Sequence, residues 1–247
     1  MRLFRSHQPY LTLTSHFNAG GCVKALHYTH SALWVGHLDG FYSFNNGKYT
    51  NHYQRALLSI TSSGQTLYTV RRDENDKLYY LTRLDTSWYP RLHRIWEWRV
   101  GCSNCLTAVG ERLVLCHNGH LGVYSGDSGQ KLFGIFHPGL RPHSPLCGVG
   151  KQGVLVGVGR RLLLFSLATQ LKQVTLVYEC KGDIRALCTD GTCDRIFIAT
   201  SNSKPIVITS SGKKVGGEVW ILGLLWKWIS LVFCNLPYTF LGLATKW

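Results

Sequence analysis

Two pairs of neighbouring arginines are the residues of this chain whose type and spacing most directly suggest chemistry. Arg71-Arg72 and Arg160-Arg161 each set two guanidinium groups side by side. A guanidinium forms two parallel hydrogen bonds to a carboxylate or a phosphate, so paired arginines favour an anionic partner. The whole chain is basic, with 27 Lys and Arg residues against 13 Asp and Glu and a formal charge of +14. This balance would attract an acidic or phosphorylated peptide, a nucleic acid or an anionic lipid surface.

A second candidate group consists of cysteines and a histidine with the spacing of metal ligands. Two residues separate Cys102 from Cys105, and Cys116 and His117 follow. Zinc takes four thiolate or imidazole ligands in a tetrahedron, so these four side chains are a candidate set for a zinc-dependent enzyme. The competing interpretation is that Cys105 and Cys116 replace small buried apolar residues of β-strands. We favour the strand interpretation and expect neither a metal nor another cofactor.

Other catalytic signatures are missing from the sequence. It contains no phosphate-binding loop, no Gly-x-Ser-x-Gly elbow and no pair of carboxylates that recurs at one phase. His27, His30 and His37 cluster in the sequence, and we interpret them as surface or turn residues. Residues 125–129 read Ser-Gly-Asp-Ser-Gly, which is ordinary turn chemistry. We therefore predict that the protein is not an enzyme.

The elements that must position these residues are the β-strands of a repeated unit. Each copy contains an inner strand, a second strand, a tight turn and a third strand, and the copies begin near residues 23, 57, 105, 145 and 184. Outer fourth strands are expected at residues 49–55, 92–100, 131–136 and 172–180. The second strands share an apolar anchor that recurs every 34 to 46 positions, at Leu33, Leu67, Leu113, Val154 and Ile196. Repeats of this length built only from strands are typical of a β-propeller.

The turns of this unit place the basic residues. Asp39-Gly40 and Asn118-Gly119 lie between second and third strands, and both tolerate the positive φ of a two-residue hairpin. In a propeller, the equivalent turns and the connections between blades open on one rim, where His143 and Lys181 would join them. The residues expected to bind a partner there are Arg71, Arg72, His117, Arg141, Arg160, Arg161 and Lys204. The alternative is a scattered, solubilising surface charge.

In these repeats and turns the chain resembles the WD40/YVTN-like β-propeller superfamily over about residues 23–213. Gly36-His37 corresponds to the Gly-His pair of WD40 repeats, whereas the chain has no Trp-Asp pair. The resemblance implies an all-β fold, a propeller of about five four-stranded blades, left incomplete if the chain is a fragment of a longer propeller. It also implies a role as a protein-interaction scaffold. We therefore predict a non-enzymatic module that presents a basic loop face to an acidic or phosphorylated macromolecular partner.

Aromatic and basic side chains alternate along residues 88–99. Such an arrangement is found on platforms that bind single-stranded nucleic acids. The segment also fits an outer strand on which Arg94, Trp96 and Trp98 share one face. We favour an outer strand that packs against its own blade.

The two ends of the chain differ from the repeats. We expect residues 1–22 to hold an outer strand of a closing or missing blade. Residues 214–247 form a hydrophobic tail, in which residues 219–236 contain one charged side chain, Lys227, and reach the lower length limit of a membrane span. A tail-anchored, membrane-associated propeller, a buried terminal element and an end unrelated to the repeats all stay open. The odd number of cysteines, nine, and a first segment without the apolar region of a signal peptide favour a cytoplasmic protein.

Overall fold

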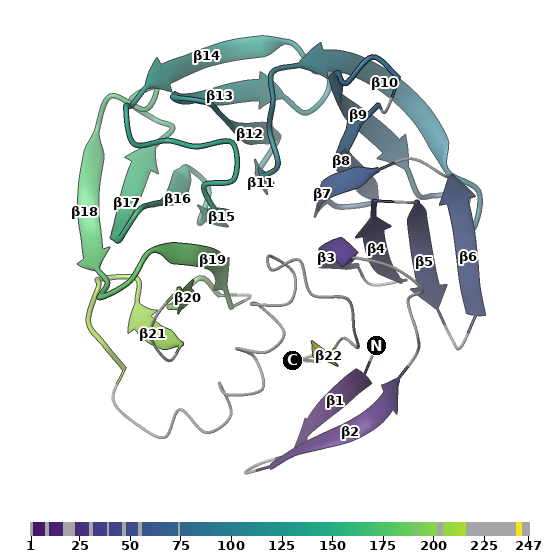
Figure 1. The fold of residues 1–247 in the computed structure, drawn as a ribbon, viewed down its shortest axis with the longest axis horizontal. Helices are drawn as coiled ribbons and strands as arrows, with labels where there is room; N and C mark the ends of the chain where they lie inside the picture. The colour runs from purple at the N-terminus through teal and green to yellow at the C-terminus, as the bar shows by residue number, and fades with distance from the viewer. Residues whose placement is uncertain are drawn as a thin grey trace.

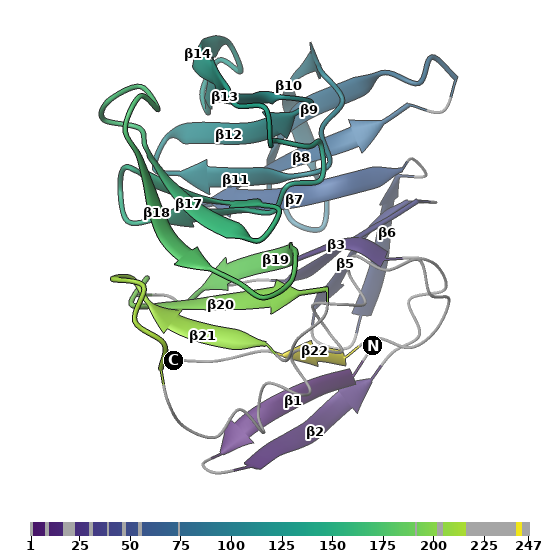
Figure 2. The same cartoon turned by 60° about the vertical axis from the view of Figure 1, so that its left-hand side comes forward.

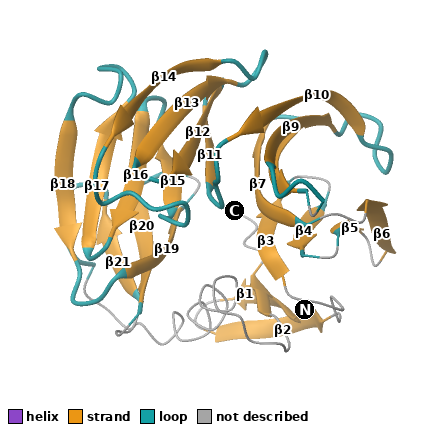
Figure 3. Cartoon of the chain, turned by 45° about the horizontal axis from the view of Figure 1, so that its top comes forward, coloured by secondary structure: helices purple, strands orange, loops and turns teal. Residues whose placement is uncertain are grey.

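The backbone consists of β-strands, tight turns and short connections in a computed structural model. The structure describes residues 2–7, 10–16, 23–29, 32–38, 40–45, 48–53, 56–73, 75–190, 192–201, 205–215 and 241–243, with the backbone alone for residues 2–7, 10–16, 53 and 241–243. None of these residues lies in a helix (Figure 3). Accordingly, this part of the chain contains no helix long and apolar enough to span a membrane. The span considered from the sequence, residues 219–236, falls outside the described residues.

Four blades each contain four antiparallel strands, which follow one another in chain order (Figure 1). The first blade consists of β3 (Val23–Tyr28), β4 (Leu33–His37), β5 (Phe41–Asn45) and β6 (Lys48–Tyr53). The second consists of β7 (Leu57–Ser63), β8 (Thr66–Arg72), β9 (Tyr79–Asp85) and β10 (His93–Val100). The third consists of β11 (Leu106–Val109), β12 (Arg112–His117), β13 (His120–Ser125) and β14 (Lys131–Phe136). The fourth consists of β15 (Leu146–Val149), β16 (Gly153–Val158), β17 (Arg161–Ser166) and β18 (Val174–Glu179).

The fifth blade is smaller than the others. Its described strands are β19 (Ile184–Thr189), β20 (Arg195–Thr200) and β21 (Ile206–Thr209), and a bridge between Ile208 and Lys214 extends its outer edge. The five blades fan around a common axis in the order of the sequence, as Figures 1 and 2 show. The predicted all-β propeller is therefore confirmed.

Segments from near both ends of the chain form a further sheet. β1 (Arg2–His7) pairs antiparallel with β2 (Tyr10–His16) and parallel with β22 (Leu241–Leu243). This sheet lies in the ring between the fifth and the first blade (Figure 1). Residues 1–22, expected to supply one outer strand, thus contain two paired strands.

The core lies between neighbouring blades. Each of four apolar clusters joins two consecutive blades, and they are represented by the pairs Trp34 and Leu57, Val70 and Leu113, Val114 and Val154, and Leu155 and Ile198. The second strands are the most buried, since all five residues of β4 are buried. The inner strands are less buried, since all four residues of β15 are only half-buried. The reason is that the inner strands surround a central cavity of about 260 Å³.

Two tryptophans of the second blade donate hydrogen bonds to the third blade. The Trp96 Nε1–H donates to the Asp127 carbonyl (2.6 Å), and the Trp98 Nε1–H donates to the Ser128 carbonyl (2.7 Å). Both acceptors lie in the turn between β13 and β14. The same turn contains Gly129, which has a φ of 72°, and a Cβ there would overlap the Trp98 ring. β10 therefore pairs within its own blade, as predicted, and its indole groups also contact the next blade.

Candidate functional site

Loops from successive blades meet at one edge of the propeller. The turn between β12 and β13 is joined to the connection from β14 to β15, because the His137 N–H donates to the Gly119 carbonyl (2.8 Å). The turn between β16 and β17 is joined in the same way to the start of β19, where the Ile184 N–H donates to the Gly159 carbonyl (2.7 Å). Turns and connections that occupy equivalent positions in the sequence repeat therefore lie at the same edge of the propeller.

A cleft of about 390 Å³ opens at this edge, where the fourth blade meets the fifth. Its charged or imidazole lining consists of Arg141 and His143 from the β14–β15 connection and of Asp183 and Arg185 at the start of β19. We call it the rim cleft. The Arg185 Nη2 lies 3.9 Å from the Asp183 Oδ2, and both side chains are half exposed, so this ion pair is weak. Two arginines thus accompany a single carboxylate, which leaves the rim cleft positively charged.

Short hydrogen bonds fix the loop that carries Arg141. The Arg141 N–H donates to the Ser144 Oγ (2.9 Å), and the Ser144 N–H donates back to the Arg141 carbonyl (3.0 Å). The Cys116 Sγ–H donates to that same carbonyl over 3.0 Å. Burial raises the pKa of Cys116 to about 12, so the group remains a thiol and keeps its donor proton at neutral pH. The third blade thereby positions a loop of the rim cleft.

Further cations lie beside the rim cleft. Arg160 is exposed in the β16–β17 turn next to Gly159, which lines the cleft, and its side chain forms no ion pair with any described residue. Arg161 is exposed as well, and its Nε lies 4.0 Å from the Glu179 Oε1. Lys181 is exposed in the connection to β19. The structure therefore brings Arg141, His143, Arg160 and Lys181 of the predicted rim into one sector.

The remaining predicted rim residues lie elsewhere or are engaged. Arg71 is 5% exposed and bonds to Glu97 and Asp73, so its guanidinium is not presented at the surface. Arg72 is exposed, with its guanidinium carbon 6.0 Å from the centre of the Tyr79 ring. The His117 Nε2 bonds to the Tyr124 hydroxyl (2.9 Å), and burial lowers the pKa of His117. Lys204 falls outside the described residues.

The candidate zinc ligands do not form a metal-binding group within the described part of the chain. Cys105 and Cys116 are buried and Cys102 is exposed, and the Cys116 thiol is already bonded to a carbonyl. Within the part of the chain that the structure describes, no three His, Cys, Asp or Glu side chains are grouped so that they could hold a metal ion. The strand interpretation of Cys105 and Cys116 agrees with this geometry, because both thiols occupy core positions.

Sequence reasoning missed two members of the rim cleft, Asp183 and Arg185. Both flank Ile184, the first residue of β19. They occupy the same position in the repeat as the blade connection that contains Arg141, so alignment of the repeats could have identified them. Arg185, however, lies in the register shift between Ile184 and Ala186, which the sequence does not mark.

Comparison with known proteins identifies a fold. No family model and no curated protein matches the chain. Solved structures similar to it number 933 chains, so the architecture is widespread and does not by itself select an activity. One of these chains belongs to the crystal structure of the mitotic checkpoint complex, with 12% sequence identity, coverage of 84% of this chain and 68% of the other, and a TM-score of 0.58. Together with the five blades around one axis, this similarity shows that the chain has a β-propeller fold.

Proposed function

We propose that this protein is a non-enzymatic interaction scaffold that binds an acidic or phosphorylated segment of another protein at the rim cleft. The observation that carries the proposal is the convergence of Arg141, Arg160 and Arg185 from three separate loops around one cleft with a single lining carboxylate. Arginine is suited to this task because its planar fork matches carboxylate and phosphate groups. The propeller fold is typical of protein-interaction scaffolds, in which loops on a rigid framework contact the partner.

The loops that form the rim cleft are ordered before any partner arrives. A backbone hydrogen bond joins Ile184 to Gly159, and hydrogen bonds with the side chains of Ser144 and Cys116 hold the Arg141 backbone. Little backbone entropy is then lost on binding, which favours affinity from a small number of contacts. The cytoplasm remains the predicted location, and the seven cysteines that the structure describes are all free thiols, in keeping with it.

The proposal is tested with two peptides of one sequence that differ in carrying serine or phosphoserine among acidic residues. We expect the triple variant Arg141→Ala/Arg160→Ala/Arg185→Ala to lose at least about tenfold in affinity for the phosphorylated peptide, measured by fluorescence anisotropy at fixed salt. The matched control is Lys151→Ala/Arg195→Ala/Lys213→Ala, which removes three charges from exposed residues in or beside the hairpin turns of the opposite edge.

The control separates a site from general attraction. Equal losses in both triple variants would mean that net charge alone captures the peptide, and the rim cleft would then not be the binding site. Tight binding of a single-stranded oligonucleotide together with no binding of either peptide would replace the protein partner by a nucleic acid.

A further inference from the structure

A second and separate cavity lies where the first blade meets the second. It has a volume of about 840 Å³, and β6, β8, β9, β10 and the loop before β10 line it. We call it the blade groove. Its volume is within the range of pockets that hold small organic ligands. None of its lining residues belongs to the rim cleft, so the two sites are distinct.

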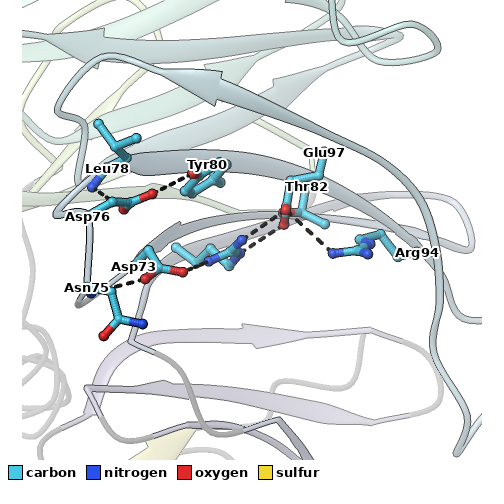
Figure 4. A network of polar contacts seen from close by, with 9 residues as sticks. Asp73, Asn75, Asp76, Leu78, Tyr80, Thr82, Arg94 and Glu97 are labelled. Atoms are coloured by element: carbon cyan, nitrogen blue, oxygen red, sulfur yellow. Dashed lines mark hydrogen bonds and ion pairs between the residues drawn. The ribbon is translucent and has the colours of Figure 1, made fainter.

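The charges at the base of the blade groove satisfy one another. The Arg71 Nε and Nη2 donate to the two Glu97 carboxylate oxygens (2.8 and 2.9 Å), and the Thr82 hydroxyl donates to one of them (3.0 Å). On its other side, the Arg71 Nη1 lies 3.2 Å from the Asp73 Oδ2. Figure 4 shows this chain of contacts, with Arg94 approaching Glu97 from the opposite direction to Asp73. Burial would raise the pKa of Glu97, but the hydrogen bonds from Arg71 and Thr82 outweigh it and lower this pKa. Glu97 is therefore a neutralised carboxylate that does not repel an anion strongly.

Two guanidinium groups of the blade groove remain available. Arg91 is exposed, and its side chain forms no ion pair with any described residue. Arg94 is 63% exposed, and its Nη1 reaches the Glu97 Oε1 only at 3.5 Å, the outer limit of a hydrogen bond. His93 is exposed beside them, and its imidazole supplies a further N–H donor.

The remaining wall of the blade groove is apolar or neutral. Leu84, Pro90 and Leu92 line it together with the ring of His52. The centre of that ring lies 5.4 Å from the ring centres of both Trp34 and Phe41, and its Nε2 is 2.8 Å from the Ser43 Oγ. Burial lowers the pKa of His52 to about 4, so the ring is uncharged at neutral pH. A ligand must therefore have an apolar body as well as a negative group.

We propose that the blade groove binds an aryl phosphate, with the phosphate between Arg91 and Arg94 and the ring against Leu84, Leu92 and His52. A phosphate monoester carries nearly two negative charges at pH 7, which matches the two available guanidinium groups. An aromatic ring covers the apolar wall, whereas inorganic phosphate would leave it in water. The source of such a ligand is either a phosphorylated tyrosine of a protein or a free aromatic phosphate.

The test uses phenyl phosphate, inorganic phosphate and phenol as probes of the full chain. We expect phenyl phosphate to bind more tightly than either fragment and to shift the amide resonances of Asn51, Thr82 and Glu97 in nuclear magnetic resonance spectra. Arg91→Ala and Arg94→Ala should each weaken phenyl phosphate binding by about tenfold. Arg99→Ala is the matched control, since it removes an exposed arginine from the same strand but outside the blade groove, and it should leave the affinity unchanged.

Three results would overturn the proposal: inorganic phosphate that binds as tightly as phenyl phosphate, an equal loss in Arg99→Ala, or shifts located at Arg141 and Arg185. Thermal unfolding of each variant verifies that it is folded. A tyrosine-phosphorylated peptide that exceeds phenyl phosphate in affinity supports a protein ligand, and equal affinity supports a small molecule. Because the rim-cleft variants leave the blade groove intact, failure here is distinguishable from failure of the proposed function.

Discussion

At the scale of single residues, Arg71 is a side chain that the sequence pattern predicts at the surface but that internal ion pairs hold inside the fold. Its position near the end of β8 suits a rim residue, yet Glu97 from β10 and Asp73 bind it, and its guanidinium carbon lies 4.3 Å from the centre of the Tyr80 ring. The partner Glu97 is 26 positions away, and the strand register brings the two together. A single sequence indicates neither that Arg71 pairs with Glu97 nor that its side chain points toward the blade interior.

We expect Arg71→Ala to lower the free energy of unfolding at pH 7 by about 2 to 4 kcal/mol, because it leaves the half-buried Glu97 carboxylate without its main partner. In the native protein the pKa of Glu97 is lowered, so its contribution is complete above the unfolded pKa and is lost as the pH falls through the lowered value. The difference between variant and parent should therefore shrink as the pH falls below the unfolded pKa of Glu, about 4.3. Urea unfolding across this range measures it. A difference that does not depend on pH would show that the ion pair is not the cause, and Arg72→Ala, at an exposed neighbour, is the control.

At the scale of elements, the turn between β13 and β14 joins two blades through Trp96 and Trp98. The sequence could predict the turn itself, because Asp127, Ser128 and Gly129 favour it. It could also predict the outer strand of residues 92–100, which the structure has as His93–Val100. The indole contacts could not be predicted, since they connect separate sheets whose distance is set by core packing.

Gly129→Ala tests this junction. We expect it to destabilise the protein by about 2 to 4 kcal/mol, because the new methyl group combines a strained positive φ with overlap of the Trp98 ring. Gly110→Ala is the control: Gly110 has a φ of 59° and no atom within 4 Å of its Cβ position, so only the backbone cost of about 1 kcal/mol remains. Chemical denaturation followed by tryptophan fluorescence compares the two. Equal costs would mean that the ring of Trp98 moves aside freely.

At the scale of the whole molecule, closure of the ring involves both ends of the described chain. β22 pairs with β1 through Arg2 and Leu241, Leu3 and Gly242, and Phe4 and Leu243. The repeat pattern predicts the five blades well because the strands and turns of each blade are encoded in its own local sequence. It does not predict the pairing of β1 with β22, which joins two segments more than two hundred residues apart whose sequences resemble neither each other nor the repeats.

We expect deletion of residues 216–247 to speed amide exchange at residues 2–4 and to lower the melting temperature, because β1 loses one of its two neighbours. The second strands β12 and β16 should keep their protection from amide exchange. Each is paired on both sides within its own sheet, and both contribute to the apolar cluster between the third and fourth blades. Hydrogen exchange read by mass spectrometry resolves these segments. Unchanged exchange in β1 would show that β22 does not contribute to closure.

The apolar clusters that join each blade to the next have an energetic consequence for the molecule as a whole. When each unit contacts mainly its neighbours, the total stability approximates a sum of blade and interface contributions. A change at one interface, such as that between Val70 and Leu113, then leaves the interface between Leu155 and Ile198 unaffected. Loops at the edge can accordingly diversify one blade at a time, because the cost of each new loop stays local to the blade that bears it.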